Sequence, residues 1–577
     1  PAVDVVAGSR HAREPRADEP AGKRFGDCDR LAARTEPLAD AFFEQVGVVG
    51  LVGRHTDSSG DWLLNLAPQS YLLSVPTVGM DPAYRVGLES IAREYDRVEC
   101  PVDGEIPSWL SGTLFRNGPG RFEVGETDLA HWFDGLAMLR RFRIESGTVT
   151  VSNRFLRSNE YSHVIEQGQL RSDQFGTTAP SSIFGRLAGL LRQELTDNAS
   201  ISVDRIGTDP IAITETPNSV GFDPETLETT GTITPDDSVS TTGSLGHPHY
   251  DFDRETVVNM GVRYGRDSAY VLFERSAEGS IRRPIASLPV DRPAYFHSFG
   301  LTEQYAILLE SPLRLNPLSL LSDRSFVESY AWDDSRQSNL LVFDRHAGEL
   351  VDRFPVEPCF VFHHVNAYEA GDEVVVDLIA FEDDTVIDSL FLDRLRGGEI
   401  PAPGGDLRRY RLSLTEGSVD ESTLQSGPLE FPMINYRQVS TQPYRYLYAA
   451  GHTAAHSPGT DQDGTEGQPT GLLDALVKVD LEADTTTVWS EPGVYPSEPV
   501  FVARDPPDAP SVDADSVEDD GVLLSVVLDT EADRSALVVL DAGSFSEIAR
   551  AELPTAFPFG FHGQWYPDGS RVHRSMP

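Results

Sequence analysis

The sequence predicts an all-β fold built as a β-propeller. From Tyr84 onward, short apolar runs alternate with Gly, Pro, Asp and Asn turns, as in successive β-strands. One hairpin pattern recurs along the chain, and stretches with a helical period are few. Radial repetition of four-stranded blades explains such a series, and a pair of β-sandwiches is the structural alternative.

The recurring pattern is an apolar run, an aspartate, a polar turn and a second strand. An aspartate at this position can cap the turn by accepting nearby backbone N–H groups. Each copy therefore predicts the outer hairpin of a blade. The copies are "VGFDPETLETTGTIT" (Asp223), "LLVFDRHAGELVDRF" (Asp344), "LVKVDLEADTTTVWS" (Asp480), "LVVLDAGSFSEIARAEL" (Asp541) and a weaker form, "YRLSLTEGSVDEST".

Three segments depart from this strand pattern. The stretches 182–195 and 311–323 are leucine-rich and predict insertions with helical character rather than core strands. Residues 1–80 mix charges, prolines and short apolar pieces without a sustained period. We expect them to form an uncertain or disordered N-terminal extension before a propeller over 81–577; a small domain and translated sequence upstream of the true start are the alternatives.

The composition excludes several classes of protein. The net charge is −44, and Lys23 and Lys478 are the only lysines, which is typical of a protein kept soluble at high salt. We therefore expect the protein to be located in the cytoplasm of a halophile. We expect no nucleic acid as partner, because the phosphates of a nucleic acid would meet a negatively charged surface. The three cysteines suggest neither a disulfide framework nor a zinc knuckle. No apolar run reaches the roughly 18 residues of a membrane span, and no signal peptide is evident.

Four of the 14 histidines stand at the ends of apolar strands. Steps of 50, 66 and 199 residues between them match no local metal motif, so four separately buried histidines are the simpler interpretation. In a propeller, however, the inner strands converge on one axis, and imidazole is a ligand for Fe, Zn, Cu and Ni. The four are His247 in "SLGHPHYDFD", His297 in "AYFHSFGL", His363 in "FVFHHVNAYE" and His562 in "FPFGFHGQW".

Three glutamates lie in strand-like or turn contexts that disfavour a charge: Glu215 in "AITETPN", Glu430 in "PLEFPMINY" and Glu498 in "YPSEPVFV". Each alone could be a surface carboxylate at a blade edge. A metal-binding histidine usually donates its other N–H to a carboxylate, so three such glutamates fit beside four such histidines.

Together these segments resemble the carotenoid cleavage oxygenase family, which includes β-carotene central-cleavage dioxygenases and retinoid isomerohydrolases. The similarity covers about residues 84–570, and the order of its motifs makes it specific. Besides the segments quoted above, it includes "GEIPSWLSGTLFRNGPGRFEVG" (104–125), "HWFDGLAMLRRFRI" (131–144), "SNRFLRSNEY", "YFHSFGLTEQYAILLESP", "LEFPMINYR" and "DDGVLLSVV".

The resemblance implies a seven-bladed propeller, with short helical insertions forming a cap over the axis of a bound metal. It implies one non-haem Fe(II) per chain, held by His247, His297, His363 and His562, with Glu215, Glu430 and Glu498 behind them. His364 would then face away from the iron, since neighbouring residues of a strand point to opposite faces. The implied reaction cleaves a C=C bond of a carotenoid, β-carotene to retinal first of all, with O₂ to give aldehydes. No residue beyond the metal centre is expected to be catalytic.

Aromatic residues are implied to line the substrate cleft. Tyr295 and Trp489 match cleft positions of β-carotene-cleaving members, and Phe381 stands where a close animal relative has tyrosine; core packing is the alternative for all three. A carotenoid must come from a membrane, so we expect peripheral contact with the inner membrane face. Leucines at 187, 190, 191, 315, 318, 320 and 321 are the candidates for an apolar patch at a tunnel mouth, or for an insertion packed on the propeller.

Three other functions share the same motifs. One is cleavage of an apocarotenoid or a stilbene. Stilbene-cleaving members of the family use a lysine near the scissile bond, and Lys478, the only lysine in the matched region, is not near a metal motif, which counts against a stilbene substrate. Another is non-oxidative isomerohydrolysis of a retinoid ester at the same metal. The last is a carotenoid-binding propeller without turnover.

Overall fold

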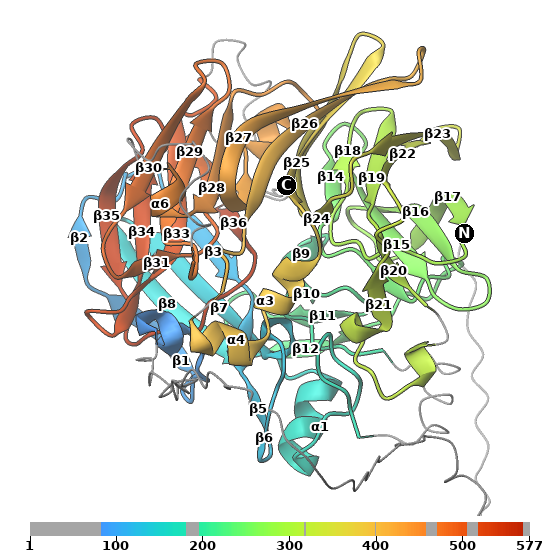
Figure 1. Ribbon diagram of the computed structural model, residues 1–577. Helices are drawn as coiled ribbons and strands as arrows, with labels where there is room; N and C mark the ends of the chain where they lie inside the picture. Colours follow the sequence, from blue (N-terminus) through green and yellow to red (C-terminus); the bar gives the residue numbers. More distant parts are fainter. Residues whose placement is uncertain are drawn as a thin grey trace, which may run out of the picture. The chain divides into compact units, whose positions relative to one another are not determined.

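The computed structural model describes residues 82–180, 195–316, 319–398, 400–456, 470–504 and 517–568. This part of the chain forms antiparallel sheets joined by turns and a few short helices (Figure 1). The predicted all-β class is confirmed. The extension predicted over residues 1–80 lies outside the described residues, as does the insertion predicted at 182–195 apart from Leu195.

Three sheets are built mainly from the first half of the chain, and β36, from near the C-terminus, completes the first of them. The first has the order β1-β8-β7-β3-β36, with β4 beside β7: β1 (Tyr95–Cys100), β3 (Gly112–Arg116), β4 (Pro119–Arg121), β7 (Leu136–Glu145), β8 (Thr148–Phe155) and β36 (Gly563–Pro567). The second, β12-β11-β10-β9, contains β9 (Ser202–Ile206), β10 (Asp209–Ile213), β11 (Ser219–Phe222) and β12 (Thr229–Ile233). The third, β13-β15-β16-β17 with β14 beside β15, contains β13 (Gly243–Ser244), β14 (His249–Asp251), β15 (Thr256–Arg263), β16 (Ala269–Ser276) and β17 (Arg282–Pro289).

Three more sheets follow, built mainly from later residues, and β2, from near the N-terminus, joins the last of them. The fourth sheet, β18-β19-β22-β23, contains β18 (Gly300–Leu301), β19 (Tyr305–Glu310), β22 (Ser338–Asp344) and β23 (Glu349–Val356). The fifth runs in chain order through β24 (Phe360–Ala370), β25 (Glu373–Phe381), β26 (Gly405–Ser413), β27 (Ser418–Met433), β28 (Tyr446–Gly451), β29 (Ala475–Asp480) and β30 (Thr485–Ser490). The sixth, β2-β35-β34-β33-β31 with β32 beside β33, contains β2 (Val102–Gly104), β31 (Val494–Pro496), β32 (Val500–Ala503), β33 (Gly521–Asp529), β34 (Arg534–Asp541) and β35 (Ser546–Glu552).

The sheets close on themselves as a propeller. In Figure 1 they follow one another in chain order, from blue through green and yellow to red, and the red strands return beside the blue ones. Strand β36, near the C-terminus, pairs with β3, and β2, near the N-terminus, pairs with β35. The predicted propeller is therefore confirmed. The seven-stranded sheet joins two successive meanders through the long strand β27, so the number of separate blades stays a prediction.

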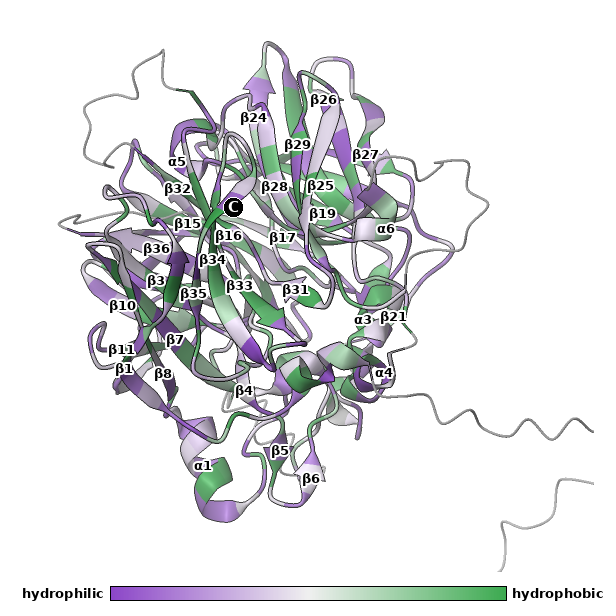
Figure 2. Cartoon of the chain, turned by 90° about the vertical axis from the view of Figure 1, so that its left-hand side faces the viewer, coloured by the Kyte–Doolittle hydropathy of each residue, from purple (hydrophilic) through white to green (hydrophobic). Residues whose placement is uncertain are grey.

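The hydrophobic core lies between neighbouring sheets. One cluster joins Phe142 of the first sheet to Leu524 of the sixth, and another joins Leu272 of the third to Leu341 of the fourth. Hydrophobic residues follow the strands, and hydrophilic ones gather at turns and outer strands (Figure 2). Because each sheet buries both faces against a neighbour, the radial stack excludes water over most strand residues.

The recurring hairpins are confirmed. The four aspartates precede the turns β11–β12, β22–β23, β29–β30 and β34–β35, and the weaker copy forms β26–β27. Each aspartate accepts backbone N–H groups of its own turn, as predicted. The donors are Glu225 and Thr226 for Asp223, His346 and Ala347 for Asp344, Glu482 and Ala483 for Asp480, and Ser544 for Asp541.

Short elements connect the sheets. Within the described ranges, the α-helices are α1 (Asn159–Gln167), α3 (Thr385–Ser389), α4 (Leu392–Gly397), α5 (Tyr436–Val439) and α6 (Thr453–His456). The two smallest sheets there are β5 (Glu123–Val124) with β6 (Thr127–Asp128), and β20 (Leu313–Leu315) with β21 (Tyr330–Trp332). The segment 311–323 thus contains a strand and one 3₁₀ turn, η3 (Ser319–Leu321), rather than an α-helix. Among the described residues, no helix is both long and apolar enough to span a membrane.

Candidate metal centre

Four histidines from four sheets meet at one point. His247 precedes β14, His297 precedes β18, His363 lies within β24 and His562 directly precedes β36. One ring nitrogen of each lies within 4.8 Å of those of the other three, and all four side chains are buried. The structure therefore brings together all four histidines proposed as ligands, although the last lies 199 residues beyond the third.

Three of the four rings are fixed by carboxylates. The Nδ1 atoms of His297, His363 and His562 lie 2.6, 2.5 and 2.7 Å from oxygens of Glu215, Glu430 and Glu498, respectively. A carboxylate can only accept, so each Nδ1 carries a proton, and in the neutral tautomer that a metal requires Nε2 presents the lone pair. The three predicted glutamates thus lie directly behind predicted ligands, and they set the tautomer that a metal requires.

Each carboxylate is itself held in place. Glu215 accepts a second hydrogen bond from the Tyr295 hydroxyl at 2.7 Å. One oxygen of Glu430 also accepts from the Phe431 backbone N–H at 2.6 Å, in a part of β27 where Phe431 has a φ of 54°. That left-handed backbone interrupts the pairing of β27 with β28 and directs Glu430 toward His363.

Glu498 has a cationic partner that the sequence reasoning did not identify. The Arg116 guanidinium, from the motif "FRNGPG", donates to the Glu498 carboxylate and, at 2.8 Å, to the backbone carbonyl of Phe561. Burial alone would raise the pKa of Glu498, but Arg116 and His562 outweigh burial and hold the pKa below its usual range. This glutamate is therefore a carboxylate at neutral pH. No sequence signal pairs Arg116 with it, because 382 residues separate the two.

The histidine group fits a cation. His363 Nε2 and His562 Nε2 lie 3.3 Å apart, and the carboxylates leave both of these atoms as lone-pair bearers. His247 Nε2 lies 3.0 Å from His297 Nε2. Burial and the neighbouring imidazoles hold the pKa of His247 well below its ordinary value, so this ring is neutral at neutral pH. Converging lone pairs on neutral imidazoles repel one another, and a divalent metal between them turns the repulsion into coordination.

His364 lies away from this group. Its Nδ1 is 2.9 Å from the Ser298 hydroxyl, and its backbone N–H donates to the same oxygen at 2.8 Å. The pairing of β24 with β25 shifts register on both sides of His364. Such bulges re-aim side chains, and here His363 faces the axis while His364 is buried between strands.

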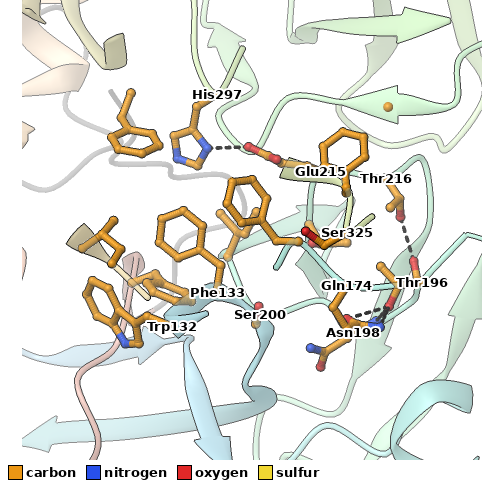
Figure 3. Close-up of a pocket in the computed structure, with 18 of the residues that line it drawn as sticks. Trp132, Phe133, Gln174, Thr196, Asn198, Ser200, Glu215, Thr216, His297 and Ser325 are labelled. Atoms are coloured by element: carbon orange, nitrogen blue, oxygen red, sulfur yellow. Dashed lines mark hydrogen bonds and ion pairs between the residues drawn. The ribbon is translucent and has the colours of Figure 1, made fainter. Parts of the chain in front are cut away.

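A cavity of about 720 Å³ opens onto the histidines. His297, His363 and His562 line it, and so do many aromatic rings, among them Trp132, Phe133, Phe175, Phe362 and Phe561. In Figure 3, Trp132 and Phe133 lie below His297, while Gln174, Thr196, Asn198 and Thr216 form a polar side. A volume of this size is typical of a small-molecule site.

The motif "HWFDG" anchors the aromatic wall. The buried Asp134 accepts hydrogen bonds from the backbone N–H of Gly176 at 2.8 Å and from the Thr177 hydroxyl at 2.5 Å. The His131 ring lies 3.1 Å from the carbonyl of Ile387 in α3 and accepts from the Phe133 backbone N–H at 3.2 Å. These contacts tie the segments carrying Phe133 and Phe175 to α3, which contributes Val386 to the cavity.

The three residues predicted to contact substrate are not among the residues that line this cavity. Tyr295 and Phe381 lie one layer behind it, because their ring centroids are 6.5 and 5.9 Å from that of Phe362. Trp489 lies on β30, at the outer edge of its sheet, and packs against the cluster around Tyr448 and Phe501. This position agrees with the outer hairpin predicted for "LVKVDLEADTTTVWS" and not with the cleft position that the family resemblance implied.

The leucines predicted for a membrane-facing patch lie in different environments. Leu320 lines the cavity, and Leu315 is fully buried in β20 and so is not part of an exposed patch. The residues at 187, 190, 191 and 318 and the side chain of Leu321 lie outside the described part.

Comparisons with known proteins agree with this site. The family model described as RPE65, retinal pigment epithelial membrane protein, matches residues 88–567. A mitochondrial carotenoid-cleaving dioxygenase of Macaca fascicularis is 32% identical over 82% of this chain and 92% of its own length. A β,β-carotene 15,15'-dioxygenase of Mus musculus is also 32% identical, over 82% and 90%. The cobalt-substituted Synechocystis apocarotenoid oxygenase has a TM-score of 0.72 at 27% identity, covering 84% of this chain and 98% of that one.

The match to the family model extends over the propeller, the four histidines and the three glutamates. The chain belongs to the RPE65 and carotenoid cleavage oxygenase family.

Proposed function

We propose that the protein is an Fe(II)-dependent dioxygenase, with one iron per chain, that cleaves a C=C bond of a carotenoid into two aldehydes. β-Carotene, cleaved centrally to retinal, is the first substrate to test, since a named relative acts on β,β-carotene. The observation that carries the proposal is the group of four buried histidines facing an aromatic cavity of about 720 Å³. In the reaction one C=C bond breaks, two C=O bonds form, and each product takes one atom of O₂.

The bound iron would supply the activation of O₂ that such a cleavage requires. The protein's own residues hold the metal and orient the substrate. Glu215, Glu430 and Glu498 keep the Nδ1 protons in place, so the rings present lone pairs to the metal throughout. The aromatic wall binds the polyene by dispersion, excludes water and fixes which double bond lies beside the histidines. No general acid or base is required, because no proton is transferred in the balanced reaction.

The supply of substrate is part of the same proposal. Carotenoids are almost insoluble in water, so the substrate reaches the cavity from a membrane at which the protein docks peripherally, on the cytoplasmic side. Leu320, one of the leucines expected at the mouth of the tunnel, lines the cavity and supports an apolar entry there.

The test is product identification with the full chain loaded with Fe(II). The protein is mixed with β-carotene in detergent micelles, under air and under anaerobic conditions, and the products are identified by mass spectrometry. We expect retinal only under air, with label from ¹⁸O₂ in the aldehyde when trapped rapidly as an oxime. Absence of any aldehyde from β-carotene and from apocarotenals would overturn the proposal, and full turnover of a retinoid ester without O₂ would replace it with isomerohydrolysis.

A further inference from the structure

Arg140, on β7, is a buried guanidinium without a carboxylate partner in the described part of the chain. It is 2% exposed, and its one hydrogen bond runs from Nη2 to the Pro119 carbonyl at 2.7 Å. Its Nε–H is buried without an acceptor. Of the seven other buried arginines, Arg205 packs over the Tyr566 ring, and the remaining six are each paired with a carboxylate: Arg116, Arg141, Arg275, Arg282, Arg314 and Arg345.

A buried cation without an anionic partner destabilises the folded state. Moving a charge out of water is strongly unfavourable unless an opposite charge and hydrogen bonds compensate. Burial, together with repulsion from the nearby Arg116, lowers the pKa of Arg140 to about 9, which still leaves the guanidinium protonated at neutral pH. Two cations therefore lie close together, and Glu498 alone among their hydrogen-bond partners is anionic. An unsatisfied buried donor of this kind calls for a partner that is not a side chain.

A small cavity lies beside the two guanidiniums. Its volume is about 10 Å³, and Arg116, Arg140, Ser497, Ser535 and Gly560 are among its lining residues. No acidic residue lines it; the remainder of the wall is apolar. The Ser535 hydroxyl accepts from the Phe557 backbone N–H at 2.9 Å, and its own proton has no acceptor in the described residues. The space suits one water molecule or one monatomic ion.

We propose that this cavity is a binding site for one small monovalent anion of the halide class, chloride in solution. The remaining N–H groups of Arg140 and the Ser535 O–H are donors, so they match an anion and repel a cation. Arg116, whose Nη atoms already donate to Glu498, Ser497 and Phe561, adds positive charge beside them. A water molecule would satisfy the donors but leave the charge of Arg140 uncompensated. The anion compensates it.

The site adjoins the metal centre. Ser497 precedes Glu498, and Gly560 lies two residues before His562; both residues also line the large cavity. Arg116 contributes to both sites, since it donates to Glu498 and lines the small cavity. With an anion beside Arg140, the repulsion between the two arginines is balanced, and Arg116 stays on Glu498. This inference does not depend on which substrate the enzyme cleaves.

Bromide replaces chloride and can be located directly. Crystals of the full chain soaked in sodium bromide are expected to give an anomalous peak within hydrogen-bond distance of Arg140, and crystals of Arg140→Met are expected to give none there. Absence of the peak in the wild-type protein, with water density in its place, would overturn the proposal.

Melting temperature provides the second test. A ligand that binds only the folded state raises stability with the logarithm of its concentration. At constant sodium concentration, we expect chloride in place of gluconate to raise the melting temperature more for the wild type than for Arg140→Met. Arg282→Met is the matched control, because it removes a buried arginine that is already paired with Asp237. The control should keep the wild-type chloride effect. An equal chloride effect in Arg140→Met and wild type would contradict the site.

Discussion

The buried guanidinium of Arg116 donates to Glu498, and the other oxygen of that carboxylate lies 2.7 Å from Nδ1 of His562. This chain of contacts connects β3, the loop before β32 and the residue before β36, which are far apart in sequence. The pair closes the propeller at its seam and orients one of the four candidate ligands there. Removing one partner of such a pair leaves an uncompensated buried charge, which typically costs about 3–5 kcal/mol.

We predict that Arg116→Met lowers metal affinity. Without the cation, the pKa of Glu498 rises, and a protonated Glu498 no longer holds the His562 Nδ1 proton firmly. The loss of an outer partner of this kind typically costs roughly 10- to 100-fold in affinity. The measurement is Fe(II) or Co(II) titration by calorimetry. Arg141→Met is the control, because Arg141 is also buried but pairs with the exposed Glu225, and its metal affinity should stay at the wild-type value. Equal losses in both variants would mean a general effect on folding.

We predict that His363 and His364 respond differently to replacement by alanine. His363→Ala removes a lone pair from the central group, so iron content and activity should fall to background. His364→Ala removes the contact with Ser298 and leaves a cavity between strands, so it should reduce the free energy of unfolding by about 1–3 kcal/mol and retain iron. Iron per chain, measured by mass spectrometry, and urea unfolding separate the two effects. Similar iron losses in both variants would refute the assignment.

Tyr295 is predicted to act through Glu215. Tyr295→Phe removes the donor at 2.7 Å from Glu215 and leaves the His297 contact intact. We expect a several-fold lower metal affinity with little change in unfolding free energy. Tyr444→Phe is the matched control, since the Tyr444 hydroxyl donates to the buried Asp377 at 2.6 Å and neither residue hydrogen-bonds one of the four histidines. If Tyr295→Phe binds metal as the wild type does, Glu215 needs no second donor.

The composition of the site was accessible from the sequence, and its electrostatic balance was not. Histidines and glutamates at strand ends stand out, because such strands otherwise contain apolar residues. Arg116 ends its strand beside a glycine-rich turn, and Arg140 lies in a strand with two other arginines, so both look like surface residues in the sequence. Only the packing of β3 and β7 at the propeller seam shows that both are buried. A long-range ion pair leaves no local periodicity, so pattern reasoning had no means to find it.

For the fold too, local features could be predicted from the sequence and long-range packing could not. The hairpins were predicted because an aspartate caps its own turn within a few residues, which is a local effect. The helix α1 was missed; its Ser158 cap and its Gly168 end are visible in the sequence, but the segment between them has only one fully buried apolar residue, Val164. Trp489 was expected in the cleft from the family resemblance alone, while the hairpin that contains it was predicted as the outer part of a blade; the structure places Trp489 on the edge strand β30.

Glu160 gives a prediction about pH. It lies buried in α1, where its carboxyl accepts backbone N–H groups of Arg171 and Ser172, and burial raises its pKa to about 7. A carboxyl whose pKa is raised in the folded state binds its proton more tightly there than in the unfolded chain. The contribution of Glu160 to the free energy of unfolding is therefore fully present below its unfolded-state pKa, near 4.5, and is lost as the pH rises to about 7. At about 1.4 kcal/mol per pKa unit, the loss is roughly 3 kcal/mol.

The measurement is urea unfolding of the wild type and Glu160→Gln between pH 5 and 8. Asp134, whose pKa burial raises to about 6, contributes a similar decline at lower pH in both proteins. We therefore expect the variant to lose the pH dependence between pH 6 and 7 and to keep the decline below pH 6. Glu310→Gln serves as the control, because Arg314 outweighs burial and lowers the pKa of Glu310. Its effect lies below pH 4.5, so this variant should retain the wild-type slope between pH 6 and 7. A slope in Glu160→Gln equal to that of the wild type would show that Glu160 is ionised throughout this range.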